Sequence, residues 1–205
     1  MRLGLFGGSF DPVHLGHLLL AESCREQCRL DEVWFLPAAV PPHKQHSQAS
    51  PGEARLEMLE LAVAAHPIFL VSRYETDRGG VNYTADTLAH FREQHPDAEL
   101  FFLLGADMLN DLPGWYQPRR VCELAAPIVV RRPGAGPIDF AAVEGITSAE
   151  RIAQIRSLQV EMPEISISST DIRHRVAAGR SIRYQVPRAV EKYILAHGLY
   201  RGGSE

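Results

Sequence analysis

The chain has 205 residues, enough for one domain with a sizeable core. Hydrophobic residues make up 45% and charged residues 22%, values close to the globular average, which excludes a wholly disordered chain. The formal net charge of −4 argues against a general nucleic-acid coat, which needs a basic surface. No apolar run is long enough to span a membrane, and the apolar start meets Gly7 and Gly8 too soon for a signal peptide.

The three cysteines, Cys24, Cys28 and Cys122, are an odd number without paired spacing. This pattern favours a reducing compartment in which the thiols are buried as small apolar groups, so we expect a cytoplasmic protein. Cys24 and Cys28 would share one face of a helix, but no partner ligands accompany them, and we predict no metal-binding residues.

Short apolar runs alternate with longer stretches of helical periodicity. We predict strands over residues 3–6, 33–36, 68–71, 100–104 and 127–130. We predict helices over residues 15–28, 53–65, 84–95, 171–178 and 188–197, the last closed by Gly198. Strands that are apolar on both faces and separated by helices indicate an α/β fold with a doubly wound parallel sheet.

The domain organisation follows from this pattern and from composition. Residues 133–145 are rich in Gly and Pro and are expected to form a loop. We expect a single domain over residues 1–205, with a small helical C-terminal part at about 168–201. Ligands of such sheets bind beyond the carboxyl ends of the strands, so the loops there are the candidate sites.

The first such loop joins strand 3–6 to the next helix and reads Gly7-Gly8-Ser9-Phe10-Asp11-Pro12-Val13-His14-Leu15-Gly16-His17. Its glycines let a ligand approach the backbone, and the helix start is a natural seat for a phosphate. His14 and His17 are three apart, so both imidazoles can face one point, and Gly16 between them leaves room for a ligand.

Three known site types do not fit this loop. Its glycines do not spell a dinucleotide fingerprint, and no Gly-Lys-Ser/Thr follows as in a P-loop. The two histidines lack the His-Glu-x-x-His spacing of a zinc protease. The structural alternative is that His14 and His17 only cap and pack the helix.

A second candidate loop precedes helix 171–178. Ser168, Ser169 and Thr170 suit an N-cap, and Arg173 follows one turn into the helix. Three hydroxyls and an arginine at a helix start also make a strong clamp for an oxyanion. Capping alone remains the alternative here.

The two loops together resemble a known superfamily. His14-Leu15-Gly16-His17 resembles the His-x-Gly-His signature of the nucleotidyltransferases, which include the class I aminoacyl-tRNA synthetases, and residues 167–173 look like the Ile-Ser-Ser-Thr-x-Ile-Arg motif of small adenylyltransferases. The resemblance implies a Rossmann-like fold and transfer of AMP from ATP with loss of pyrophosphate. It assigns catalytic roles to His14, His17, Arg173 and Lys44. It assigns ATP binding to Gly7, Gly8, Ser9, Phe10, Gly16, Gly105, Asp107, Ile167, Ser168, Ser169 and Thr170.

The middle of the chain is similar to one branch, the bacterial nicotinate-mononucleotide adenylyltransferases. The matching segments are Pro41-Pro42-His43-Lys44, residues 82–88, Gly105-Ala106-Asp107, Trp115-Tyr116 and Arg131-Arg132-Pro133. The resemblance implies that Thr84, Trp115, Tyr116 and Arg132 bind nicotinate mononucleotide. It also implies Mg²⁺ carried with ATP, no nucleic-acid or membrane partner, and leaves a homo-oligomer open.

The residues taken alone leave plainer alternatives open. Lys44 would also suit a solvated loop, Thr84 an ordinary N-cap, and Trp115 a cover over the edge of the core. A sister enzyme acting on nicotinamide mononucleotide or phosphopantetheine is the nearest rival, and a non-catalytic nucleotide sensor is a rival of another class. Residues 134–158 match no motif of the family.

Overall fold

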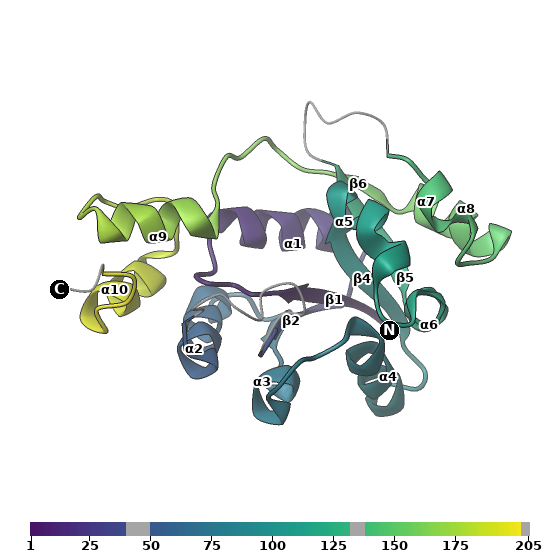
Figure 1. The fold of residues 1–205 in the computed structure, drawn as a ribbon, viewed down its shortest axis with the longest axis horizontal. Helices are drawn as coiled ribbons and strands as arrows, with labels where there is room; N and C mark the ends of the chain where they lie inside the picture. The colour runs from purple at the N-terminus through teal and green to yellow at the C-terminus, as the bar shows by residue number, and fades with distance from the viewer. Residues whose placement is uncertain (40–49, 132–137, 202–205) are drawn as a thin grey trace.

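A six-stranded parallel sheet forms the centre of the described chain, which comprises residues 1–39, 50–131 and 138–201 of a computed structural model (Figure 1). The strands lie in the order β3-β2-β1-β4-β5-β6, and every neighbouring pair is parallel. Their bounds are β1 (Arg2–Gly8), β2 (Glu32–Pro37), β3 (Phe69–Val71), β4 (Glu99–Gly105), β5 (Ala126–Arg131) and β6 (Gln159–Glu161). The chain runs outward from β1 to β3 and then resumes on the other side of β1 with β4, so the topological switch point lies between β1 and β4.

Helices cover both faces of this sheet. They are α1 (Leu15–Cys28), α2 (Gly52–Val63), α3 (Tyr74–Arg78), α4 (Thr84–Gln94), α5 (Ala106–Asp111), the 3₁₀ helix η2 (Leu112–Gly114), α6 (Pro118–Leu124), α7 (Ala141–Glu144), α8 (Ala149–Ser157), α9 (Ser169–Ala177) and α10 (Arg188–Ala196). One apolar cluster joins α1, α2, α9 and α10 to one face, and the other joins α4 to α8 to the opposite face. Across the described ranges, no helix has the length and apolar character needed to cross a membrane.

The predicted doubly wound sheet is confirmed, because each central strand buries side chains on both faces. In β4, Phe101 and Leu103 enter the cluster under α1, whereas Phe102 and Leu104 enter the cluster under α4. The five predicted strands and five predicted helices all form, with ends within two residues of those expected. Gly198 follows α10 with φ +62°, the left-handed conformation expected of a closing glycine.

The prediction of a loop over residues 133–145 is wrong for its last part, where residues 141–144 form a helix. Helix α7 begins at Ala141, and α8 and the edge strand β6 follow it. Val143 and Ile155 are fully buried against the second apolar cluster. The reason is tertiary: α7 has four residues and shows no period of its own, so its contact with the core decides its structure.

The cysteine prediction is confirmed for burial, and it leads to a test. Cys24, Cys28 and Cys122 are free and buried, and burial raises the pKa of each thiol, that of Cys122 to about 11. Since only the thiolate is nucleophilic, roughly 0.1% of Cys122 is reactive at pH 8. We expect iodoacetamide at pH 8 to leave all three cysteines of the folded protein unmodified and to label all three in urea, as measured by intact mass. Labelling of the folded protein at the unfolded rate would contradict this.

Candidate active site

The loop after β1 turns at Phe10 rather than at a glycine. Phe10 has φ +46°, a conformation that is uncommon for a residue with a side chain and is found at functional sites. Its ring is 1% exposed and packs edge-on against Phe6 at 5.3 Å and His17 at 5.0 Å between ring centroids. A Cβ on Gly8 would lie 2.9 Å from the Phe10 ring, so this ring position requires a glycine at residue 8. Phe10 can therefore offer a ligand only its main chain.

The two histidines of this loop lie face to face at the start of α1. Their ring centroids are 3.7 Å apart at an interplanar angle of 21°, and the main-chain N–H of His14 donates to Nδ1 of His17 at 3.3 Å. His14 is the N-cap residue and is 7% exposed. A Cβ on Gly16 would lie 3.0 Å from Nδ1 of His14, so the room expected for a ligand at Gly16 is taken by the His14 ring. This arrangement concentrates two imidazoles at one helix N-terminus.

The second predicted loop docks onto the first. Ser168 caps α9, as predicted, by accepting from the main-chain N–H of Asp171 at 3.0 Å. The Ser169 hydroxyl donates to the carbonyl of Pro12 at 2.9 Å, and Ile167 packs against the apolar cluster under α1. The hydroxyls thus hold the structure together, and the main-chain N–H groups at the α9 start are what this helix can present to an anion.

Arg173 connects the two loops from the side of α9. Its Nη1 donates to the main-chain carbonyl of Asp11 at 2.7 Å, and its Nη2 donates to the Thr170 hydroxyl at 3.2 Å. A guanidinium carries five N–H donors in a fixed plane, so these bonds fix its orientation between α9 and the β1–α1 loop. The structure therefore brings His14, His17 and Arg173 onto adjoining segments.

The C-terminal segment also holds the β1–α1 loop. The main-chain N–H of Leu15 donates to the carbonyl of Gln185 at 2.9 Å, which satisfies one of the unpaired donors at the α1 start. The hydroxyl of Tyr200 donates to Oδ1 of Asp11 at 2.6 Å. Burial, followed by this hydrogen bond, raises the pKa of the Tyr200 phenol above its ordinary value.

Sequence reasoning missed a buried arginine behind the loop. Arg55 on α2 is 1% exposed and donates to the main-chain carbonyls of Ser9, Ala38, Ala39 and Ser50, at 2.7–3.2 Å. Burial lowers the pKa of Arg55, and the Asp11 carboxylate opposes this. One signal was available: Arg55 lies three and four residues before Met58 and Leu59, on the buried face of α2.

The predicted acceptor residues lie at the start of α4 and after η2. Tyr83, not Thr84, is the N-cap of α4, so the N-cap prediction for Thr84 is wrong by one residue. Tyr83 packs against Tyr116 with ring centroids 4.5 Å apart, which joins the α4 start to the Trp115-Tyr116 segment. Trp115 stands edge-on to Phe102 and packs on the apolar cluster under α4, so it does cover the core edge.

The remaining predicted site residues follow the strand ends. Gly105 ends β4 beside the switch point, and a Cβ there would lie 2.5 Å from Oδ1 of Asp107, which follows it in α5. Asp107 is exposed. Lys44 and Arg132 lie outside the described residues.

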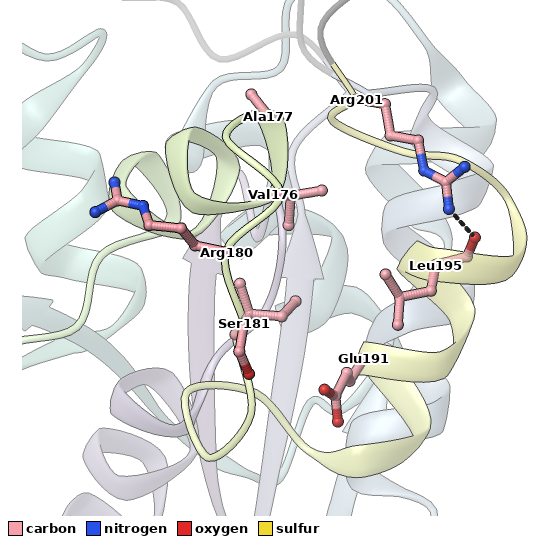
Figure 2. A pocket seen from close by; sticks show the side chains of 9 residues that line it. Val176, Ala177, Arg180, Ser181, Glu191, Leu195 and Arg201 are labelled. Carbon is pink, nitrogen blue, oxygen red and sulfur yellow. Dashed lines mark hydrogen bonds between the residues drawn. The ribbon is translucent and has the colours of Figure 1, made fainter.

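Two further observations bear on what this site can bind. In the part of the chain that the structure describes, no group of three or more His, Cys, Asp or Glu side chains could hold a metal ion. A pocket of about 650 Å³ lies away from the two loops, between the end of α9 and α10, and Figure 2 shows Arg180 and Arg201 on opposite sides of it. This pocket contains none of the site residues predicted from the sequence.

Comparison with known proteins agrees with this geometry. The family model described as Cytidylyltransferase-like matches residues 5–175, which include both loops. Fold, site and family model together define a nucleotidyltransferase.

Two similar proteins indicate which group of nucleotidyltransferases the chain belongs to. A Thermus thermophilus protein is 50% identical over 201 residues, covering 98% of this chain and 100% of the relative, and a Thermomicrobium roseum protein is 48% identical over 200 residues, covering 98% and 92%. Both carry the name "Probable nicotinate-nucleotide adenylyltransferase". The chain belongs to the cytidylyltransferase-like family and, within it, to the nicotinate-nucleotide adenylyltransferases.

A solved structure shares the fold at much lower identity. The Plasmodium falciparum nicotinic acid mononucleotide adenylyltransferase complexed with NaAD superposes with a TM-score of 0.75 at 20% identity, covering 97% of each chain. This likeness confirms the architecture.

Proposed function

We propose that the protein transfers the AMP part of ATP to nicotinate mononucleotide, giving nicotinate adenine dinucleotide and pyrophosphate in NAD biosynthesis. The observation that carries the proposal is the docking of two helix starts, with His14 and His17 face to face on α1 and Arg173 reaching across from α9. The relatives' names support nicotinate mononucleotide as the acceptor.

The proposed chemistry needs no general base. A phosphate oxygen of nicotinate mononucleotide attacks the α-phosphorus of ATP in line, a new P–O bond forms, and the bond to pyrophosphate breaks. The attacking phosphate is already anionic near pH 7, so catalysis rests on positioning and on stabilisation of developing charge. ATP enters with its own Mg²⁺, which the triphosphate oxygens and water hold as part of the substrate.

The chain's residues supply the donors. His14 and His17 donate hydrogen bonds to α- and β-phosphate oxygens, and Arg173, Lys44 and the main-chain N–H groups at the α9 start bind the leaving pyrophosphate. The main chain of residues 7–10 and the Gly105–Asp107 corner line the ATP side. Thr84, Trp115, Tyr116 and Arg132 bind the acceptor, with Trp115 stacking on the pyridine ring.

Replacing Trp115 by Ala is expected to raise the KM for nicotinate mononucleotide about tenfold and to leave the KM for ATP within about twofold. The reason is that an aromatic plane stacked on a base contributes about 1–3 kcal/mol. The measurement is steady-state kinetics with each substrate varied in turn. Trp34→Ala is the matched control, since Trp34 packs against Phe91 away from the loops and loses a similar aromatic area. Equal changes in both KM values would assign Trp115 to the core alone.

Pyrophosphate release from ATP and Mg²⁺ tests the proposed function directly. Nicotinate mononucleotide, its amide analogue and phosphopantetheine are supplied as separate acceptors. A clear preference for the nicotinate nucleotide is expected. Turnover only with another acceptor would retain AMP transfer and replace the substrate, and no turnover with any acceptor would favour a nucleotide sensor.

A further inference from the structure

Asp11 is a buried carboxylate inside the loop that carries the histidines, and it is held from several directions. It is 5% exposed. Its Oδ1 accepts from the Tyr200 hydroxyl at 2.6 Å, and its Oδ2 accepts from the main-chain N–H of Ser50 at 3.2 Å. Its main-chain carbonyl accepts from Arg173 at 2.7 Å. One residue thus binds Arg173 through its main chain and Tyr200 through its side chain.

The Tyr200 contact joins two places where the backbone is strained. Tyr200 has φ +61°, and Phe10, directly before Asp11, has φ +46°. Residues other than glycine rarely adopt a positive φ. Such a conformation persists where the surrounding structure fixes it, and it is found at functional sites. The strained backbone at Tyr200 and directly before Asp11 indicates that the fold fixes the position of Tyr200 relative to Asp11.

The ring and the hydroxyl of Tyr200 have separate contacts. The ring is partly buried against the apolar cluster under α1, together with Leu199. On the side of Arg201, a pocket of about 650 Å³ separates this segment from the end of α9, so packing does not hold it there (Figure 2). The hydroxyl, which also interacts with the Ser50 side chain, is therefore the group that ties the segment to the β1–α1 loop. A phenylalanine would keep the packing of the ring and lose only the contacts of the hydroxyl.

We propose that Tyr200 is a positioning residue for AMP transfer. Its hydroxyl fixes Asp11, and Asp11 in turn fixes the backbone that meets Arg173 on one side and leads to His14 on the other. This inference rests on the proposed function, because it concerns the same phosphate donors. A loop shifted by a fraction of an ångström still binds substrates but aligns its donors poorly, so the effect falls on turnover.

The test compares Tyr200→Phe with Tyr193→Phe. Tyr193 lies on α10, packs on the same apolar cluster and interacts through its hydroxyl with Glu57 on α2, so its variant loses a comparable hydroxyl outside the loop. For Tyr200→Phe we expect kcat to fall about tenfold at a temperature where both variants are fully folded, with the KM for nicotinate mononucleotide within about twofold. Its unfolding midpoint is expected to lie below that of Tyr193→Phe, because the buried Asp11 carboxylate loses a donor. Tyr193→Phe is expected to keep the turnover of the unmodified protein.

A double-variant cycle distinguishes a positioning role of Tyr200 from a general contribution to the stability of the fold. If Tyr200 acts through Asp11, Tyr200→Phe is expected to have no further effect on kcat in the Asp11→Ala background. Should Asp11→Ala fail to fold, the split between kcat and KM in the single variant decides. Unchanged kcat in Tyr200→Phe, or a loss that disappears at a temperature where the variant is fully folded, would overturn the inference while the proposed function stands. Absence of turnover in the unmodified protein with every acceptor would overturn both.

Discussion

Replacement of His17 by Ala is expected to lower kcat by at least about 100-fold while the protein stays folded. Removing one donor that binds charge developing in a transition state costs about 3–4 kcal/mol, or roughly 100- to 1000-fold in rate. In this protein the loss includes a second effect, because the His14 ring stacks on His17 at 3.7 Å and loses its neighbour. The measurement is pyrophosphate release at saturating ATP and nicotinate mononucleotide, with far-UV circular dichroism to confirm the fold.

The matched control for His17→Ala is His90→Ala. His90 on α4 is also half of a stacked pair, with ring centroids 3.8 Å from Tyr74, but it lies outside the two loops. The His90→Ala variant is expected to keep turnover within about twofold, although it loses a ring-stacking contact similar to the one that His17→Ala loses. A His17→Ala variant with turnover near that of His90→Ala would remove His17 from the catalytic group.

Replacement of Arg55 by Met is expected to lower the free energy of unfolding by about 3–5 kcal/mol. The guanidinium donates to four main-chain carbonyls from three segments, and methionine would leave these acceptors without a donor around a side chain that is 1% exposed. In a chain of this length the melting temperature should fall by about 10 °C. Urea unfolding monitored by circular dichroism gives the free energy, and thermal unfolding gives the midpoint.

Arg92→Met provides the control for Arg55→Met. Arg92 also donates to main-chain carbonyls, those of Pro96, Ala98 and Leu124, but it is only partly buried, so water can replace its bonds. Its variant is expected to lose no more than about 1 kcal/mol. If Arg55→Met cost no more than Arg92→Met, the four carbonyls would have to find other donors, and Arg55 would not be the residue that joins the three segments.

The fold could be predicted from the sequence where a pattern repeats locally. The central strands are apolar at successive positions, such as residues 100–104, because helices cover both faces of the sheet. The helices that were predicted have 9 to 14 residues and show a period. Helices α3 and α7 have five and four residues, too short for a period, and β6 has three residues at the sheet edge. Their structure is decided by contacts with the rest of the chain.

The candidate site could be predicted in part, for a related reason. Residues 14–17 and 167–173 are short contiguous motifs, so the sequence displays them. The bonds that hold these motifs together join residues far apart in the chain: 46 residues from Arg55 to Ser9, 162 from Arg173 to Asp11 and 189 from Tyr200 to Asp11. Such polar contacts leave no local pattern, and the turn at Phe10 uses a residue type that does not signal a turn.

The docking of α9 and Tyr200 onto the β1–α1 loop has a consequence for the order of folding. The pairings of β1 with β2 and β4 need much shorter closures, since Leu3 meets Glu32 and Leu100, whereas the loop meets α9 across 157 residues. Closing a longer stretch of chain costs more entropy, and long-range contacts form slowly. The strands can thus pair before the two helix starts meet. Because α9 and α10 also contribute to the apolar cluster on the face of α1, the docking that assembles the site completes that half of the core as well.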